Sequence, residues 1–467
     1  MFKNFIWAFI EKGGQFFIQF ISVVILSRFI TPEEYGTYGI MAVFIAVSEL
    51  LIDSGFGGAL VHKKRITQKD INTLFVSNFA ISVLLYVILY ILAPIISNYY
   101  GINELIIYIR VLGLTIIFYS LTIVHYTLLQ RELKFKKSAN ITVIASLLTV
   151  FIVVVLAILD FGIWALILQP LLMAIFTSVM LWSIEKRNIR IEFSKASFKI
   201  LWSFGSKLLV ANLLQTLYNN ISTSIIPKIA TVRVSGFYYQ AYRLNSIPSS
   251  MLQMTVDKAT FPMLTKEIFD DNILQKAREM NAVLFFLFFP LFPLLSLMSI
   301  EVINMVLGSS WVGASAFLSV LAFGGWGTLL QALYRNIFKS VGDTKTILKI
   351  DFIKTIIGFC ILGLSVFFGV TFLIWGLTVS MYIGAICYMI SVHKRFSFTL
   401  GQQLNELKFP ILTTVMCYVC FYPIEYFSAH EWYNLLLLVP YICLYILINK
   451  ILKNPIYRTL RFKIAKK

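Results

Sequence analysis

The chain has 467 residues, of which 59% are hydrophobic and only 13% are charged, far from the usual composition of a soluble globular protein. Its formal net charge of +18 is compatible with a nucleic-acid partner, but lysine and arginine also concentrate in the cytoplasmic loops of membrane proteins. Long apolar runs recur as far as the C-terminus, whereas a membrane barrel has alternating segments of about ten residues. The composition therefore predicts an all-α integral membrane protein with no nucleic-acid partner.

About 14 apolar stretches are long enough to cross a membrane as helices. The first leads directly into further spans and lacks a small-residue cleavage site, so we expect a retained helix and not a signal peptide. The connections are short, which predicts a helical bundle without an inserted soluble domain. The predicted spans cover 5–27, 38–60, 75–97, 105–129, 139–159, 162–183, 203–226, 236–257, 281–300, 313–334, 347–368, 372–392, 409–427 and 432–450.

The basic residues divide unevenly between the two sets of alternating connections. One set, which includes both termini and the segment 184–200, holds most of the 40 lysines and arginines. The other set holds only Arg28, Lys228 and Arg233. The positive-inside bias therefore predicts that both termini are cytoplasmic, and the even number of spans agrees. We expect the basic tail, 450–467, to lie on anionic membrane lipids.

The two halves of the chain have matching residues near their starts, which predicts an internal repeat. Tyr35-Gly36-Thr37-Tyr38 has a counterpart in Ser235-Gly236-Phe237-Tyr238. Each half has six predicted spans, so both start on the same side of the membrane, and the halves are expected to be parallel repeats around a central cleft. The repeat rests on the match of Trp7, Phe9, Lys12 and Pro32 with Trp202, Phe204, Lys207 and Pro227.

The repeat predicts four parts in the chain. Two of them are six-helix bundles, and the last two spans fall outside the repeat. The parts are an N-terminal bundle at 1–183, a basic cytoplasmic linker at 184–202, a C-terminal bundle at 203–395, and two extra helices with a basic cytoplasmic tail at 396–467.

Four sequence blocks follow one another over roughly the first 395 residues. They are ILSRFITPEEYG at 25–36, DSGFGGAL at 53–60, LQRELKF at 129–135, and Phe261-Pro262 followed by GSSW at 308–311. In this order they resemble the polysaccharide-transporter (oligosaccharide flippase) family of the multidrug/oligosaccharidyl-lipid/polysaccharide exporter superfamily. The resemblance implies a bacterial inner-membrane protein that moves undecaprenyl-pyrophosphate-linked sugar repeat units for O-antigen, capsule or exopolysaccharide assembly. It also raises the question of a partner polymerase or chain-length protein.

Five basic residues fall inside predicted spans: Lys12, Arg110, Lys207, Arg243 and Lys354. A charge at mid-bilayer costs roughly 2.5–3.5 kcal/mol on insertion scales, so each should face the bundle interior, a water-filled cleft or an acidic partner. The matched repeat positions of Lys12 and Lys207 predict that they approach the central axis from opposite sides. A cationic cleft would suit a pyrophosphate and acidic sugars.

Local alternatives remain open for these cations. Lys12 neighbours Glu11, and Lys354 lies three residues after Asp351, a spacing that places both on one helix face. Arg110 and Arg243 could instead extend toward a membrane interface. The sequence therefore leaves both cleft lining and local pairing as interpretations.

Three acidic residues, Glu11, Glu49 and Asp53, are candidates to carry a coupling proton or to hold Na⁺. Glu11 has the alternative role of neutralising Lys12. Asp53 lies beside Gly55, so a turn role is an equal alternative.

Polar side chains form two stripes inside the predicted spans. Asn212, Gln215 and Asn219 share one helix face, and Gln15 and Gln19 form a shorter stripe. These amides could hydrogen-bond sugar hydroxyls in the cleft, or bond between helices.

No catalytic motif is present. The sequence lacks a P-loop, a GxSxG or Ser/His/Asp arrangement and an HExxH motif, so we expect neither an enzyme nor a bound cofactor or metal. Cys417-x-x-Cys420 lies in an apolar stretch, which favours core packing over metal binding.

Besides the flippase, a multidrug or small-solute cation antiporter of the same fold remains an alternative. A membrane-bound glycan polymerase would need an outward catalytic loop that the sequence lacks.

Overall fold

The computed structural model describes residues 2–53, 55–266, 273–396, 398–427 and 436–452, with Asn454 and Tyr457. Within these, the side chains at 2–12, 62, 204, 207–208, 211, 257–259, 261–266, 273–274 and 424–427 are not described. Every regular element in the described ranges is a helix, which confirms the predicted all-α class. The chain divides into two compact units, Met1–Tyr239 and Gln240–Lys467.

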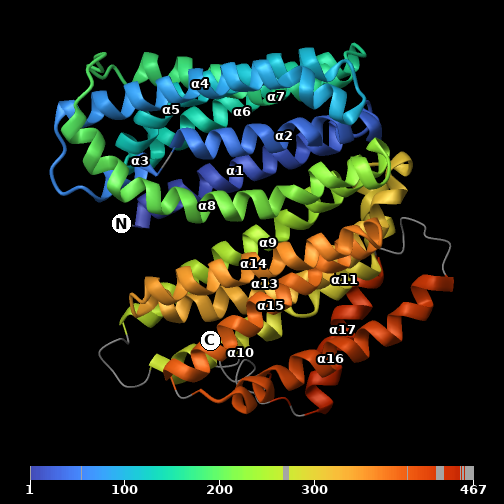
Figure 1. The fold of residues 1–467 in the computed structure, drawn as a ribbon. Helices are drawn as coiled ribbons and strands as arrows, with labels where there is room; N and C mark the ends of the chain where they lie inside the picture. The colour runs from blue at the N-terminus through green and yellow to red at the C-terminus, as the bar shows by residue number, and fades with distance from the viewer. Residues whose placement is uncertain are drawn as a thin grey trace. The chain divides into compact units, whose positions relative to one another are not determined.

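The described residues of unit 1 form eight helices and the first two turns of a ninth (Figure 1). Among them, α4 packs on α5, α1 on α6, α7 on both α5 and α6, and α8 on α2. The helices are α1 (Phe2–Leu26), α2 (Pro32–Asp53), α3 (Phe56–His62), α4 (Gln68–Tyr100), α5 (Leu105–Arg131), α6 (Phe135–Ile158), α7 (Ile163–Ile184), α8 (Lys195–Ile229) and the start of α9 (Val232–Lys266).

Helix α2 begins six residues before the predicted span, at Pro32, because its N-terminus is strongly capped. Proline suits the first helical position, where no backbone N–H is needed. The Glu34 carboxylate accepts hydrogen bonds from the Thr31 N–H at 2.8 Å and from the Thr31 hydroxyl at 3.0 Å. The Glu34 N–H donates back to the Thr31 hydroxyl at 3.3 Å, which completes a capping box. The other Glu34 oxygen accepts from the N–H of Ile163 at 2.8 Å and so joins α2 to the start of α7.

The two matching glycines of the repeat, Gly36 in α2 and Gly236 in α9, contact each other in unit 1. A Cβ on Gly36 would lie 1.9 Å from the carbonyl oxygen of Val232, and a Cβ on Gly236 would lie 1.8 Å from that of Pro32. The contact is reciprocal, since each Cβ would also lie 3.0–3.1 Å from the backbone nitrogen of the other glycine. Only residues without a side chain allow the two backbones to approach this closely.

Unit 2 contains the remaining helices (Figure 1). Helix α15 packs on both α13 and α14, and α11 packs on α13 and α16. The elements after α9 are α10 (Ile273–Phe288), α11 (Leu291–Leu297), α12 (Ser299–Val306), the 3₁₀ helix η1 (Ser309–Ala314), α13 (Ser315–Ser340), α14 (Thr344–Val366), α15 (Val370–Phe396), α16 (Leu400–Phe427) and α17 (Leu438–Ile451).

The predicted span 281–300 is not one continuous helix. It is divided among α10, α11 and α12, and Pro290 follows the end of α10. Proline supplies no N–H for the helical ladder, so a helix ends readily at this point. Similarly, the predicted span 38–60 is divided at Gly55, which has a left-handed φ of 68° and begins the short helix α3.

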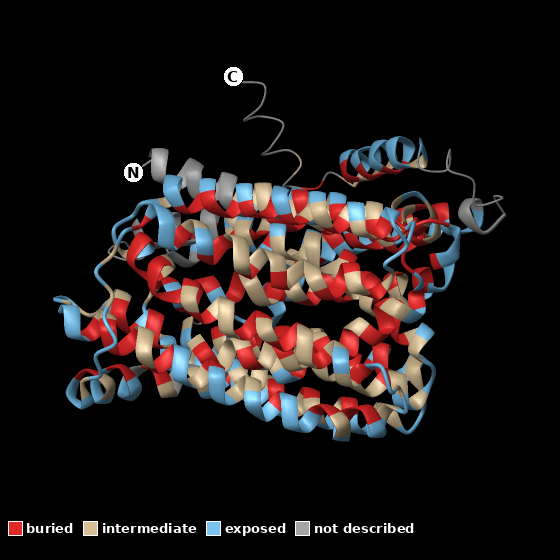
Figure 2. Cartoon of the chain, turned by 90° about the horizontal axis from the view of Figure 1, so that it is seen from above, coloured by how far each residue is buried: buried red, intermediate tan, exposed pale blue. Residues whose placement is uncertain are grey.

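Within the described residues, nine helical segments are long and apolar enough to cross a membrane. Exposed positions recur along the helices and are not confined to their ends (Figure 2). Many of these exposed side chains are large and apolar, for example Ile91, Phe151 and Leu364, as expected for surfaces that face lipid. The membrane class is therefore confirmed, whereas the count of 14 spans, the four-part division and the parallel repeat around a cleft stay predictions.

Candidate functional site

A cluster of charged and polar side chains joins three helices of unit 2. Asp351 of α14 lies at its centre, with one carboxylate oxygen 3.1 Å from Nη2 of Arg335 in α13. The other oxygen lies 3.0 Å from Nζ of Lys354 and accepts a hydrogen bond from the hydroxyl of Tyr388 in α15 at 3.0 Å. Lys354 also donates to the side-chain oxygen of Gln331 at 3.1 Å. We call these five residues the Asp351 cluster.

Helix geometry explains how the cluster assembles. Lys354 follows Asp351 by three residues and Arg335 follows Gln331 by four, so each pair lies on one helix face. The Gln331 amide donates to the carbonyl of Met381 in α15 at 2.7 Å, which fixes its oxygen toward Lys354. The cluster thus holds two cations and one carboxylate. The Arg335 side chain is 52% exposed, compared with 20% for Lys354 and 22% for Asp351, so the cation on α13 is the accessible one.

A second acidic group lies in unit 1, near the C-terminal end of α2. Glu49 and Asp53 are one helical turn apart and half-buried. Asp53 accepts a hydrogen bond from the backbone N–H of Gly57. This bond crosses the break between α2 and α3, as the turn interpretation expects, and the coupling role of Asp53 stays a prediction. Among the side chains that the structure describes, no lysine or arginine forms an ion pair with either carboxylate.

The other predicted cations have different surroundings. Arg110 in α5 places its guanidinium 3.9 Å from the ring centroid of Tyr90 in α4, a distance at which a cation–π contact stabilises the charge. Arg243 is half-buried on α9 in unit 2. The structure therefore brings Lys354 together with other charged groups, but leaves Arg110 on an aromatic ring.

Three predicted site residues have side chains outside the described part of the structure: Glu11, Lys12 and Lys207. Their helices, α1 and α8, are described. The proposed meeting of Lys12 and Lys207 across a cleft stays a prediction, as does the pairing of Lys12 with Glu11.

Two side chains of the predicted polar stripe on α8 form a hydrogen bond with each other. Gln215 donates to the side-chain oxygen of Asn219 at 2.9 Å, whereas Asn212 is exposed. On α1, Gln15 is half-buried and Gln19 is exposed. The amides thus lie on accessible faces of unit 1, and their role toward a sugar stays a prediction.

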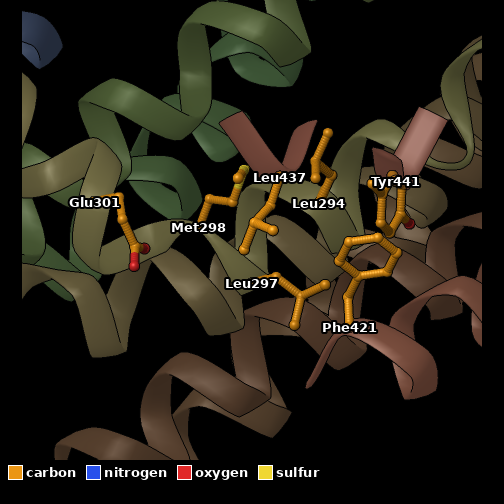
Figure 3. Close-up of a pocket in the computed structure, with 7 residues that line it drawn as sticks. All are labelled: Leu294, Leu297, Met298, Glu301, Phe421, Leu437 and Tyr441. Atoms are coloured by element: carbon orange, nitrogen blue, oxygen red, sulfur yellow. The ribbon is translucent and has the colours of Figure 1, made fainter. Parts of the chain in front are cut away.

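A small pocket in unit 2 lies apart from the predicted site residues. Its walls come from α11, α12, α16 and α17, and Figure 3 shows Glu301 to one side of a group of apolar side chains. The pocket has a volume of about 10 Å³, room for about one water molecule, so it cannot hold a sugar. Its walls are formed by Leu294, Leu297, Met298, Glu301, Phe421, Leu437 and Tyr441.

Sequence reasoning missed Arg335 and Tyr388. The sequence predicts that Arg335 lies in the connection after the span 313–334, but α13 continues to Ser340 and includes it. One signal was available, since Gln331 and Arg335 have the spacing of neighbours on a helix face. Nothing in the sequence indicated that Tyr388, 37 residues after Asp351, would reach it.

Another carboxylate between two cations lies outside the membrane-spanning helices of unit 1. Glu132, directly after α5, is 2.7 Å from Nζ of Lys134 and 2.8 Å from Nη2 of Arg187. The pKa of Glu132 is lowered from 4.5 to about 2, mainly by the hydrogen bond from Arg187. Arg187 also pairs with Glu185 at 3.0 Å. These contacts attach the basic segment after α7 to the connection between α5 and α6.

Fold and composition together define a polytopic helical membrane protein with charged groups inside its helices. The sequence model of the family described as "Polysaccharide biosynthesis protein" matches residues 25–316. The chain belongs to this family, and the resemblance predicted from the four sequence blocks is confirmed.

The chain is also similar to individual proteins. The chain is 25% identical to the teichuronic acid biosynthesis protein TuaB of Bacillus subtilis over 322 residues, which cover 68% of this chain and 67% of that protein. It is 25% identical to the succinoglycan biosynthesis transport protein ExoT of Rhizobium meliloti over 321 residues, 68% of this chain and 65% of that protein. The fold is similar to that of the lipid II flippase MurJ, with a TM-score of 0.77 and 16% identity over 98% of this chain and 99% of that one.

Proposed function

We propose that this protein is a flippase that translocates undecaprenyl-pyrophosphate-linked oligosaccharide repeat units across the bacterial inner membrane. The product would serve O-antigen, capsule or another exopolysaccharide. The observation that carries the proposal is the family match over residues 25–316. The transport named for the Rhizobium relative supports it, and the fold shared with a lipid II flippase supports it as well. The proposal assigns transport, and no catalytic step, to this chain.

The proposed route is a cleft between two six-helix bundles, at 1–183 and 203–395, with both termini cytoplasmic. Cations would line it and bind the pyrophosphate, because N–H donors of lysine and arginine form strong charge-assisted bonds with phosphate oxygens. The Asp351 cluster supports this role for Lys354 and adds Arg335 as an accessible partner. The full set proposed to line the cleft is Lys12, Arg110, Lys207, Arg243 and Lys354, with Gln15, Gln19, Asn212, Gln215 and Asn219 toward the sugars.

A proton or Na⁺ gradient would drive the cycle of alternating access. Glu49 and Asp53 are the proposed coupling groups, with Glu11 as a further candidate. A carboxylate that lies among helices without a cationic partner is stabilised when it binds a proton or a sodium ion. Glu49 and Asp53 satisfy that condition among the described side chains. A polysaccharide polymerase or chain-length protein is a further proposed partner, at the last two helices.

The test is a deletion strain combined with purified protein. Without the protein, lipid-linked repeat units should accumulate on the cytoplasmic face and surface polymer should fall. In reconstituted vesicles, a fluorescent undecaprenyl-pyrophosphate glycan should cross the bilayer faster when a proton or Na⁺ gradient is present. Unchanged surface polymer and unchanged lipid-linked pools in the deletion strain would contradict the proposal.

A second candidate is a multidrug or small-solute cation antiporter of the same fold. The two carboxylates of α2 favour it, since no cation among the described side chains pairs with them and an anionic site attracts cationic solutes. Efflux of cationic dyes from cells, measured with and without a pH gradient, separates the two functions. An antiporter would protect the cells from the dyes, whereas a glycan flippase would leave their sensitivity unchanged.

A further inference from the structure

The Asp351 cluster has one more positive than negative group. Arg335 and Lys354 occupy opposite oxygens of a single carboxylate, at 3.1 and 3.0 Å. Two cations that converge on a pair of oxygens also match two oxygens of a phosphate group. The carboxylate of Asp351 thus lies where an anionic ligand of these two cations would bind.

One contact of Lys354 does not involve the carboxylate of Asp351. Lys354 keeps its bond to Gln331 at 3.1 Å, and Gln331 is itself fixed to α15 through the carbonyl of Met381. Arg335 is half-exposed and can meet a ligand from outside the cluster. Asp351, in contrast, depends on the hydroxyl of Tyr388 and on the two cations.

We propose that Asp351 is a built-in counter-ion that competes with the pyrophosphate of the ligand for Arg335 and Lys354. This inference rests on the proposed function. In the empty protein the carboxylate neutralises part of the charge of the two cations. The arriving pyrophosphate displaces it, and the returning carboxylate speeds release of the ligand. Asp351 is therefore a positioning residue that sets affinity and release without being a ligand of the substrate itself.

The proposal makes a prediction that a purely structural ion pair does not make. Removing the negative charge of Asp351 should strengthen binding of a lipid pyrophosphate and slow its transport. If Asp351 only orients the two cations, its loss should weaken binding. The direction of the change in Kd therefore distinguishes the two roles.

The experiment uses full-length protein in nanodiscs with farnesyl pyrophosphate as the probe, and farnesol as the control for the lipid chain. Asp351→Asn keeps the size of the side chain and an oxygen that can accept from Tyr388. Its Kd should fall about tenfold relative to the original protein, because the neutral amide no longer competes with the pyrophosphate for the two cations. In vesicles, its transport rate at saturating ligand should fall below that of the original protein. The matched control is Asp160→Asn, which removes one exposed negative charge in the other unit.

A second variant tests the proposal independently, in case Asp351→Asn does not fold. Tyr388→Phe removes the hydrogen bond to Asp351 and keeps every charge, so its Kd should fall in the same direction by a smaller factor. Arg335→Gln should weaken binding both alone and combined with Asp351→Asn. Should Asp351→Asn fail to fold, tighter binding by Tyr388→Phe supports the proposal and unchanged or weaker binding overturns it.

The outcomes separate this inference from the proposed function. If the original protein binds farnesyl pyrophosphate but Asp351→Asn binds it equally or more weakly, the counter-ion role is wrong and the flippase proposal stands. If the original protein shows no binding, the pyrophosphate site itself is wrong, and both proposals fall. Glucuronate and inorganic pyrophosphate are tested alongside. Tighter binding by Asp351→Asn that is confined to glucuronate would assign the cations to acidic sugars and overturn the role toward pyrophosphate.

Discussion

Helices α2 and α14 both carry acidic side chains inside predicted spans, but the surroundings of these carboxylates differ. On α14, Asp351 has two cations and a tyrosine hydroxyl within 3.1 Å. On α2, Glu49 and Asp53 are half-buried, Asp53 accepts from the backbone of Gly57, and no described cation pairs with them. A paired carboxylate can stay charged and hold its cations, whereas an unpaired one in an apolar setting favours binding of a proton or metal ion. The comparison therefore fits the two roles proposed above, with anion binding on α14 and ion coupling on α2.

The two helices also differ in how closely their backbones approach neighbours. Gly36 of α2 lies directly against the backbone of Val232, whereas a Cβ on Gly363 of α14 would meet no atom within 4 Å. Helix α2 is thus fixed by close packing near its start, and α14 by its charged side chains. Different substitutions should therefore destabilise the two helices.

The largest expected effect is that of Gly36→Ala. Its Cβ would lie 1.9 Å from the Val232 carbonyl oxygen, so the two helices must move apart, at a cost of about 3 kcal/mol in the free energy of unfolding. The matched variant Gly363→Ala should be neutral or up to about 1 kcal/mol more stable, because alanine favours the helix. Unfolding in bicelles measures both. Equal stability of the two variants would contradict the close contact on α2.

Asp351→Ala should have the next largest effect. It removes two ion pairs and one hydrogen bond, and it leaves Arg335 and Lys354 as neighbouring like charges. We expect a loss of about 2 kcal/mol in the free energy of unfolding. Combining it with Arg335→Gln should recover part of the loss, since one of the two cations is then gone. A double variant that is less stable than the sum of its single variants would argue against charge repulsion.

Glu49→Gln should change stability by less, within about 1 kcal/mol, because no described cation loses a partner. Its main effect should be on transport, which should lose its dependence on the ion gradient and retain ligand binding. The measurement is the transport rate in vesicles with and without a proton or Na⁺ gradient. If Glu49→Gln responds to both gradients as the original protein does, the coupling role on α2 is wrong.

The sequence alone predicted the membrane class, the family and some of the residues in the two candidate sites. Spacing along one helix predicted that Lys354 can pair with Asp351, because i,i+3 neighbours lie on the same helix face. It could not predict Tyr388, which comes from another helix, nor Arg335, whose helix extends beyond the apolar stretch that marked it. The repeat matched Gly36 with Gly236, but contact between matched residues depends on tertiary packing. Likewise, Arg110 had the same sequence signal as Lys354, and only packing placed it on the ring of Tyr90.

The smallest expected effect concerns Glu132, whose two cations lie on one carboxylate oxygen at a more solvent-accessible site than that of Asp351. It too has two cations, Lys134 at 2.7 Å and Arg187 at 2.8 Å, but water screens these pairs. At pH 7, Glu132→Gln should therefore cost less than about 1 kcal/mol, compared with about 2 kcal/mol for Asp351→Ala. Equal losses would show that the surroundings of Asp351 add nothing to its ion pairs.

The pH dependence of this small effect has a definite sign. The hydrogen bond from Arg187 lowers the pKa of Glu132 from 4.5 to about 2, so the folded protein binds this proton more weakly than the unfolded chain does. The stabilisation by Glu132 is therefore fully present above pH 4.5 and is lost as the pH falls toward about 2. The difference in Tm between the original protein and Glu132→Gln should shrink over this range. If the difference in Tm persists near pH 2, it does not come from the ion pairs of Glu132. Glu132 would then be unsuitable for comparison with the ion pairs of Asp351.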